Sequence, residues 1–245
     1  MRFSLCLCFL KRIFEVNDFS YIKRNYEKIR ESIAKCAQRY GTPEPVLVAV
    51  TKSAELCEID ALLSLGIGRI AENRVQMLTA RYEHILSTGA PLPEMHLIGQ
   101  LQSNKVKYIA DKAALIHSLD KLSLAKEINR QGEKIGRKIP CLIEINSGRE
   151  QAKGGVMPED ADELAEAVKD MPFITLSGVM TMAPICERQS DYSKYFSLTR
   201  DIFERLKPLF GTDTPVLSMG MSNSYEAAIA EGATLLRVGR AFFEK

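Results

Sequence analysis

Residues 215–238 read PVLSMGMSNSYEAAIAEGATLLRV, and this stretch decides the fold class. An apolar run at 215–219 leads through a turn into a short helical segment at 225–230, and a second apolar run follows at 234–238. Both runs are continuous rather than alternating, as in strands that are covered on both faces of a parallel sheet. The stretch therefore predicts a strand–helix–strand unit with parallel strands.

The same alternation continues through the rest of the chain. Six earlier apolar runs lie at 46–50, 69–71, 95–98, 114–117, 140–145 and 174–182. Between them lie amphipathic helical patterns, among them residues 158–169, where Pro158 suits the first helical turn. About eight strands separated by helices, with no long Gly/Ser/Pro linker, predict an α/β protein with one closed (β/α)8 TIM barrel. A doubly wound open sheet is the structural alternative.

A long amphipathic helix precedes the first strand and favours closure. Its apolar face carries Ile22, Tyr26, Ile29, Ile33, Cys36 and Tyr40. Gly41 is a typical stop, and Lys245 follows the last strand so closely that no final covering helix is expected. In a closed barrel the first and last strands are neighbours, so we expect the N-terminal helix to cover the gap between them. We expect residues 1–17 to form a poorly ordered extension and residues 18–245 to form the barrel.

Composition and charge limit the class of protein, its partners and its location. The 245 residues are 46% hydrophobic and 26% charged, which is globular, and the net charge of +2 argues against nucleic acid or membrane partners. The apolar stretch at 4–10 is interrupted at once by Lys11 and Arg12, so we expect no signal peptide. The cysteines are scattered and indicate neither a disulfide framework nor a zinc site. They are Cys6, Cys8, Cys36, Cys57, Cys141 and Cys186. We expect a cytoplasmic protein with reduced thiols.

Lys52 is the first candidate for chemistry. The first strand ends in VAVTKS, residues 48–53, so it delivers a lysine at its carboxyl end, where barrel enzymes place their sites. A lysine that is partly desolvated, or near other cations, loses proton affinity and becomes a nucleophile that forms imines. The alternative is a surface lysine at the start of a loop.

The turn at residues 218–224 has the features of a phosphate cradle. Glycine permits close backbone approach, Ser218 and Ser222 supply hydroxyls, and the following helix offers free N–H groups at its start. Asn223 and Glu226 also fit a plain helix-capping pattern, which is the structural alternative.

A second glycine turn makes the combination informative. The last strand ends in Arg237-Val238-Gly239-Arg240, and phosphate sites after strands 7 and 8 recur in this fold. Strand 1 adjoins strand 8 in a closed barrel, so Lys52 would lie beside such a phosphate. A phosphate site next to a lysine that forms imines suggests pyridoxal 5′-phosphate (PLP), held by a Schiff base.

Two other patterns do not indicate a functional site. Residues 66–71, GIGRIA, match a dinucleotide fingerprint, but they follow a helix and enter a strand, which is the reverse of the required order. His84, His96 and His117 are dispersed without metal spacing. We expect His84 on a solvated helix surface, and His96 and His117 in the core or at the rim.

With these residues in view, the chain resembles the YggS/PROSC family of pyridoxal phosphate homeostasis proteins. The resemblance runs from about Ala49 to Phe242, and its segments follow one another in the right order. They are AVTK at 49–52, ENRVQ at 72–76, HLIGQLQSNK at 96–105, IHSLD at 116–120, Asn146 with Glu150, Lys153 and Gly155, GVMTM at 178–182, SMGMS at 218–222 and RVG at 237–239.

The resemblance implies a role for each candidate residue, on a barrel of the alanine racemase N-terminal type. It implies that Lys52 forms the Schiff base with PLP, that Asn73 lies near the cofactor ring and that Arg237 faces the pyridine nitrogen. The implied phosphate ligands are Ser218, Ser222, Gly239 and Arg240, the last through its backbone, and Met221 belongs to the same binding turn. Asn223-Ser224 stands where an acidic residue is common, and Ala71 stands where glycine is usual.

The resemblance also bears on catalysis. Racemases of this type take a second base from an additional domain and a partner chain, and an arginine does not give its proton to the ring nitrogen. We therefore expect a PLP carrier or reservoir with little or no catalysis. The alternatives are a low-activity amino-acid racemase, with Tyr40, Tyr108 or Tyr225 as a second base, and a class I aldolase. As partners we expect PLP and transient apoenzyme recipients, no metal, and a monomer.

Overall fold

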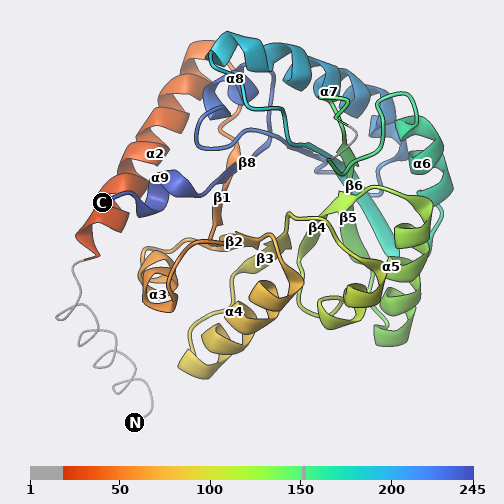
Figure 1. Ribbon diagram of the computed structural model, residues 1–245, viewed down its shortest axis with the longest axis horizontal. Helices are drawn as coiled ribbons and strands as arrows, with labels where there is room; N and C mark the ends of the chain where they lie inside the picture. The colour runs from red at the N-terminus through yellow and green to blue at the C-terminus, as the bar shows by residue number, and fades with distance from the viewer. Residues whose placement is uncertain (1–18, 151–152) are drawn as a thin grey trace.

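The structure is a computed structural model that describes residues 19–150 and 153–245, so the expected extension at residues 1–17 lies outside the described residues. Within that part of the chain, eight parallel strands form a closed barrel in which β8 pairs with β1 (Figure 1). The strands are β1 (Val46–Val50), β2 (Arg69–Glu72), β3 (Glu94–Leu97), β4 (Leu115–Leu119), β5 (Ile139–Ile145), β6 (Ile174–Thr181), β7 (Val216–Ser218) and β8 (Leu235–Val238). Closure confirms the barrel and excludes the open sheet.

Helices surround the barrel, as Figure 1 shows. They are α2 (Ser20–Tyr40), α3 (Leu56–Ser64), α4 (Val75–Thr88), α5 (Leu122–Ile135), α6 (Ala161–Val168), α7 (Ser193–Leu206), α8 (Tyr225–Ala230) and α9 (Arg240–Phe243), with 3₁₀ turns η1 (Ser103–Tyr108), η2 (Gln189–Tyr192) and η3 (Lys207–Leu209). The 3₁₀ turn η1 connects β3 to β4 where other connections carry an α-helix. In the described residues no helix is long and apolar enough to cross a membrane.

The start of α6 differs from the expectation. Pro158 lies in a turn before the helix rather than in its first turn, because the chain is still tied to β5 shortly before it. Val156 donates its N–H to the carbonyl of Glu144 at 2.8 Å and accepts the N–H of Asn146 at 2.9 Å. Helical conformation therefore begins only at Ala161.

Helix α2 covers the junction of β1 and β8, as expected. It lies beside α8 and α9 (Figure 1). The amide of Asn25 donates to the carbonyls of Phe242 at 3.1 Å and Glu244 at 2.7 Å, and Ser32 is hydrogen-bonded to Tyr225 at 2.8 Å. Gly41 ends the helix in the left-handed conformation, with φ of 65°. The helix thus supplies the outer cover that the single turn of α9 is too short to give.

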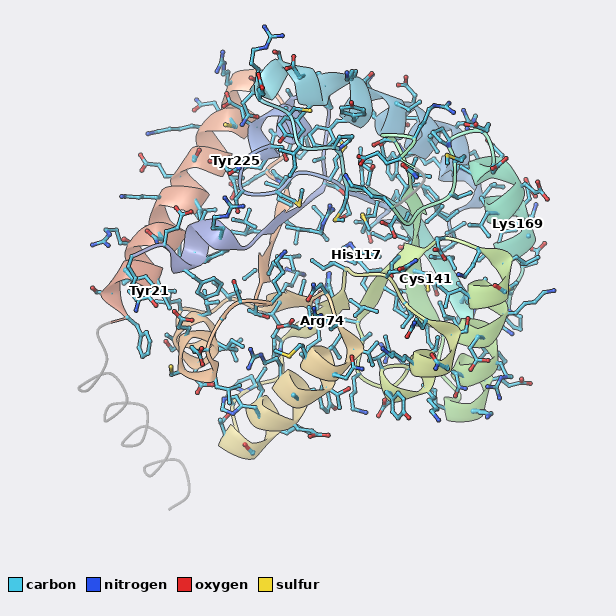
Figure 2. All side chains as sticks on the ribbon, viewed as in Figure 1. Tyr21, Arg74, His117, Cys141, Lys169 and Tyr225 are labelled. Carbon is cyan, nitrogen blue, oxygen red and sulfur yellow. The ribbon has the colours of Figure 1, made fainter. Side chains whose placement is uncertain are left out.

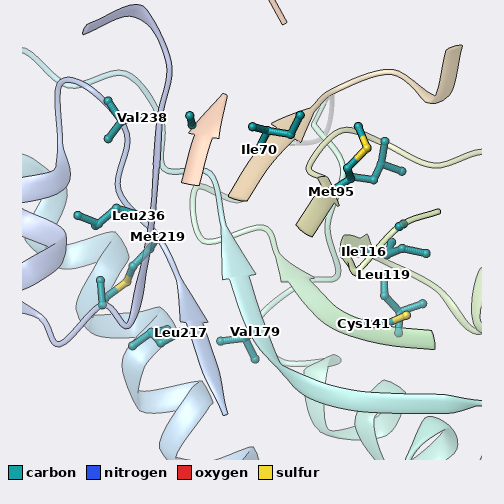
Figure 3. Packing of buried hydrophobic residues seen from close by; sticks show 14 of the residues in the cluster. Ile70, Met95, Ile116, Leu119, Cys141, Val179, Leu217, Met219, Leu236 and Val238 are labelled. Carbon is teal, nitrogen blue, oxygen red and sulfur yellow. The ribbon is translucent and has the colours of Figure 1, made fainter. Parts of the chain in front are cut away.

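The alternation of side chains along the strands divides the buried residues into two sets. Leu217, Met219, Leu236 and Val238 belong to the large core between the barrel and the helices (Figure 3). The smaller set lies inside the barrel and consists of Val48, Val50, Ala71, Leu115, Leu142, Met180 and Leu235. Because alternate residues of a barrel strand point inward, Ser218 and Arg237 also face the interior.

Candidate functional site

Lys52 lies in the turn that follows β1, at the carboxyl end of the barrel strands. Its side chain is exposed rather than partly desolvated, because the turn stands on the rim of the barrel. Within the described part of the chain the Lys52 amine has no hydrogen bond or ion pair. A primary amine in this position is open to a carbonyl compound that enters the barrel mouth.

Buried groups hold the backbone on both sides of Lys52. The hydroxyl of Thr51 donates to Oε1 of Glu72 at 2.6 Å, and Nη2 of Arg81 donates to the carbonyl of Ala54 at 2.6 Å. Nε of Arg81 lies 3.7 Å from Oε1 of Glu72. Burial raises the pKa of Glu72, and the hydrogen bond from Thr51 and the charge of Arg81 oppose that rise. The turn that carries the amine is therefore fixed in place, although the amine itself is exposed.

The turn between β7 and α8 exposes polar groups at the same end of the barrel. Gly220 has φ of 90°, and a Cβ atom there would lie 2.6 Å from Cβ of Ala228, so no other residue fits. Ser224 is the N-cap residue of α8 without a side-chain cap, and its hydroxyl accepts the N–H of Met221 at 3.1 Å. The capping roles considered for Asn223 and Glu226 are therefore wrong. Within the described residues, neither the N–H nor the hydroxyl of Ser222 has a partner.

The turn after β8 adjoins both Lys52 and this cradle. The N–H of Arg237 donates to the carbonyl of Gly220 at 3.1 Å, which joins the two turns. A Cβ atom on Gly239 would lie 3.1 Å from Val50, two residues before Lys52. Arg240 begins α9 with an exposed side chain, and its N–H has no acceptor among the described residues. Among the described residues, the N–H groups of Ser222 and Arg240 thus both lack an acceptor, and backbone donors of this kind suit a phosphate.

Arg237 is 1% exposed and points into the barrel. Nη1 donates to Oγ of Ser218 at 2.6 Å, and Nη2 donates to the carbonyl of Thr181 at 2.8 Å. Nε is buried and has no partner within the described part of the chain. Burial lowers the pKa of Arg237 to about 10, so the side chain stays cationic at neutral pH. A buried donor without an acceptor is costly, so this atom calls for a ligand.

The Ser218 hydroxyl is engaged by other side chains inside the barrel. It is fully buried and is shared by Arg237 and by Nδ1 of His117 at 3.1 Å. One hydrogen and two lone pairs leave little capacity for a further strong contact. The Ser218 hydroxyl therefore holds Arg237, and its phosphate role stays a prediction.

The remaining candidates line the same end. Asn73 is half-buried directly after β2, and its backbone packs so closely on Gly99 that a Cβ atom there would lie 2.1 Å from the Asn73 carbonyl oxygen. Met221 is half-buried beside Ser222. The structure therefore brings Lys52, Asn73 and both glycine turns to the carboxyl end of the barrel.

Sequence reasoning missed two carboxyl groups in the barrel mouth. Among the described residues, Glu144 is 8% exposed and its side-chain carboxyl has no hydrogen bond, and Oδ1 of Asp120 is buried without a partner. Burial, and next the charge of Asp120, raise the pKa of Glu144 to about 7, and the charge of Arg237 opposes them. Burial also raises the pKa of Asp120. Asp120 ends the segment IHSLD but was assigned no role there, and Glu144 lies in an ordinary apolar strand, so no pattern marked either carboxyl group as functional.

The histidines divide as expected between core and helix. His96 and His117 are buried inside the barrel, and Nδ1 of His96 lies 3.0 Å from Nε2 of His117. His117 is near the centre of the barrel (Figure 2). His84 is only half-buried on α4 and is hydrogen-bonded to Asp60 at 2.9 Å. No cluster of three metal-ligating side chains exists in residues 19–150 and 153–245.

The three tyrosines considered as a second base lie away from the barrel mouth. Tyr225 is hydrogen-bonded to Ser32 of α2 in the outer layer, where Figure 2 also places it. Tyr40 is 39% exposed near the end of α2, and Tyr108 is 51% exposed on η1. Within the described part of the chain, none of these three side chains has a hydrogen bond with Lys52.

These residues fit a phosphorylated aldehyde with a ring nitrogen. Ser222 and the N–H groups at 222 and 240 suit the phosphate, and the free amine of Lys52 suits the aldehyde. The unpaired Nε of Arg237 suits a nitrogen that accepts a hydrogen bond.

Comparison with known proteins gives one consistent family. A family model described as "Alanine racemase, N-terminal domain" matches residues 19–244. The chain is 38% identical over 218 residues to the pyridoxal phosphate homeostasis protein of Aquifex aeolicus, covering 88% of this chain and 94% of the relative. Identity to the protein of the same name from Escherichia coli strain K12 is 35% over 228 residues, covering 91% and 95%. The solved structure of PipY from Synechococcus elongatus with PLP bound is similar, with a TM-score of 0.74, 29% identity, and coverage of 86% of this chain and 100% of PipY.

Proposed function

Because the chain belongs to the family of pyridoxal phosphate homeostasis proteins, we propose that it binds PLP at the carboxyl end of its barrel and takes part in intracellular PLP homeostasis. The observation that carries the proposal is that Nε of Arg237 is buried and has no partner among the described residues, on a strand that lies between β7 and β1. An apolar ligand would leave this donor without an acceptor, whereas the nitrogen of a pyridine ring accepts a hydrogen bond from it.

Each binding residue then has a definite task. Lys52 would hold the aldehyde end of PLP through its amine, as a Schiff base. Ser222, with the backbone at Gly239 and Arg240, holds the phosphate, Asn73 and Met221 border the ring, and Arg237 donates to the ring nitrogen. When bound, PLP supplies an electron sink for carbanion chemistry. Arg237 restrains that chemistry because its pKa of about 10 keeps its proton from passing to the ring at neutral pH.

We propose a carrier or reservoir with little or no catalysis. The absence of the three tyrosines from the barrel mouth supports this view over a low-activity racemase, because racemisation needs bases on both faces of the substrate. Transfer to apoenzymes, a monomeric state and a cytoplasmic location belong to the same proposal. The cytoplasmic location is supported by the described cysteines, Cys36, Cys57, Cys141 and Cys186, which are all free.

An absorbance spectrum of the purified protein, saturated with PLP, tests the proposal. We expect an imine band, and borohydride reduction followed by peptide mapping should place the adduct on Lys52. A colourless protein, or an adduct chiefly on Lys105 or Lys153, would contradict the site. Release of the α-hydrogen of alanine or serine into deuterated water would favour the racemase instead.

A further inference from the structure

A file of four buried side chains crosses the interior of the barrel. Nη1 of Arg237 lies 2.6 Å from Oγ of Ser218, Oγ of Ser218 lies 3.1 Å from Nδ1 of His117, and Nε2 of His117 lies 3.0 Å from Nδ1 of His96. The residues come from β8, β7, β4 and β3, and each is at most 3% exposed. The proposed PLP contacts use only the Arg237 end of this file.

The hydrogen bonds of the file have a consistent direction. Arg237 can only donate, so Ser218 accepts from it. Burial, and next the neighbouring charges of His96 and Arg237, hold the pKa of His117 well below its usual range, so the ring is neutral at pH 7. The hydroxyl hydrogen of Ser218 can then go to Nδ1 of His117, and Nε2–H of His117 can go to Nδ1 of His96. Each donor along the file thereby meets one acceptor.

The file has an effect on Arg237 that apolar packing would not have. Arg237 shares the barrel interior with an apolar cluster that includes Leu115, Leu142 and Met180 and offers it no hydrogen-bond acceptor. Ser218 and the carbonyl of Thr181 take up the two terminal nitrogens of the guanidinium, and since the group is planar, the direction of Nε is then fixed. Without His117, the Ser218 hydroxyl is free to rotate, and Arg237 loses a rigid acceptor.

We propose that His117, supported by His96, is a positioning residue that acts through Ser218 to hold Arg237 ready for the ring nitrogen of PLP. This inference rests on the proposed function. It assigns a role in cofactor affinity to side chains that do not touch the cofactor.

The opposite end of the file is open to solvent. His96 lines a cavity of about 390 Å³ at the amino end of the strands, and the ion pair between Arg69 and Glu94 stands at its rim. Nε2 of His96 lies 3.8 Å from Oε2 of Glu94. The file therefore reaches from this cavity to the carboxyl end of the barrel, where we propose that PLP binds. A substitution at His96 should therefore change the affinity for PLP at the opposite end of the barrel.

The test compares PLP affinity and the absorbance maximum of bound PLP in the full-length chain and four variants. His117→Leu removes both ring contacts, His117→Asn keeps an acceptor for Ser218, and His96→Leu acts one step further away. His84→Asn is the matched control, because His84 has a hydrogen-bonded partner outside the barrel. We expect His117→Leu to raise the Kd for PLP about tenfold, because Arg237 loses its fixed acceptor and donates less well to the ring nitrogen, and to shift the absorbance maximum. His117→Asn should stay within about threefold of the original Kd, and His96→Leu should fall between them.

A double-mutant cycle shows whether the effect passes through Ser218. In the Ser218→Ala background, His117→Leu should produce no further change in Kd, because the link to Arg237 is already cut. If His117→Leu fails to fold, judged by circular dichroism, His96→Leu and Ser218→Ala carry the test. Additive effects in the cycle, or unchanged Kd and spectrum in His117→Leu, His96→Leu and Ser218→Ala, would overturn the inference and leave the proposed function intact. Failure of the unaltered protein to bind PLP would overturn both.

Discussion

The hydroxyl of Thr51 donates to Oε1 of Glu72 at 2.6 Å, and this contact joins the residue before Lys52 to the end of the neighbouring strand. Arg81 completes the clamp from α4 by holding the carbonyl of Ala54 on the other side of Lys52. The exposed amine is therefore carried by a turn whose flanks are buried. Stability and reactivity at Lys52 should be separable, because they depend on different side chains.

Removing Glu72 should destabilise the protein. Glu72→Ala leaves Arg81 as a buried cation without its carboxylate, and we expect a loss of about 3 kcal/mol in the free energy of unfolding. Glu72→Gln keeps an acceptor for Thr51 and should lose less. Urea denaturation measures both, with Glu31→Ala as control, because Glu31 belongs to an exposed helix pair with Lys35. Equal stability of Glu72→Ala and the control would show that the clamp is not a support.

Lys52→Ala should abolish the imine band and leave the fold intact. The side chain is exposed and has no partner in the described residues, so we expect a change in unfolding free energy within about 0.5 kcal/mol. Circular dichroism and the absorbance spectrum with saturating PLP check the two halves of this prediction. Lys105→Ala, at another lysine of the carboxyl end, should keep the band. A global loss of helical signal in Lys52→Ala would mean that Lys52 has a structural role.

Gly220→Ala should damage both the fold and the phosphate cradle. The residue has φ of 90°, and its Cβ atom would lie 2.6 Å from Ala228, so we expect a loss of about 2 kcal/mol or more. Thermal unfolding and PLP titration provide the measurements. Gly211→Ala is the control, because Gly211 is exposed and a Cβ atom there meets only Thr175 at 3.7 Å. Tight PLP binding by Gly220→Ala would show that the cradle lies elsewhere.

Glu144 should make stability depend on pH. Its folded-state pKa of about 7 lies above its ordinary value, so between these values the folded chain binds more protons than the unfolded chain. The contribution is fully present below the ordinary pKa and is lost as pH rises through 7, by about 3 kcal/mol in all. Urea denaturation of PLP-free protein from pH 4.5 to pH 8 should therefore show a falling difference between the unaltered chain and Glu144→Gln. A constant difference across this range would contradict the raised pKa.

The fold was predictable because hydrophobic periodicity is a local property. Each of the eight apolar runs became a strand, with bounds that moved by one or two residues at several ends. The covering position of α2 was predictable because the sequence shows a long helix before the first strand and no room for a covering helix after the last one. The position of Pro158 did not, because the backbone contacts of Val156 with β5 come from another element and delay the helix.

The site was predictable in its backbone and less so in its side chains. Lys52 and the glycine turns follow strands whose order around the barrel is fixed by topology. The direction of the Ser218 hydroxyl depends on His117, which is 101 residues away in the sequence, and no local pattern reports that pairing. Glu144 was missed for a related reason: its pKa depends on Asp120 and Arg237, which other strands bring to it.

The hydrogen bonds from Asn25 to the carbonyls of Phe242 and Glu244 join positions that are 217 and 219 residues apart. Such pairings join residues very far apart in the sequence, and they cannot form before the last strand has been synthesised. The neighbours of Lys52 on β8 arrive at the same late moment. During synthesis the edge of β1 that pairs with β8 therefore stays open until β8 has been made, and until then it is exposed to edge-to-edge association with other chains.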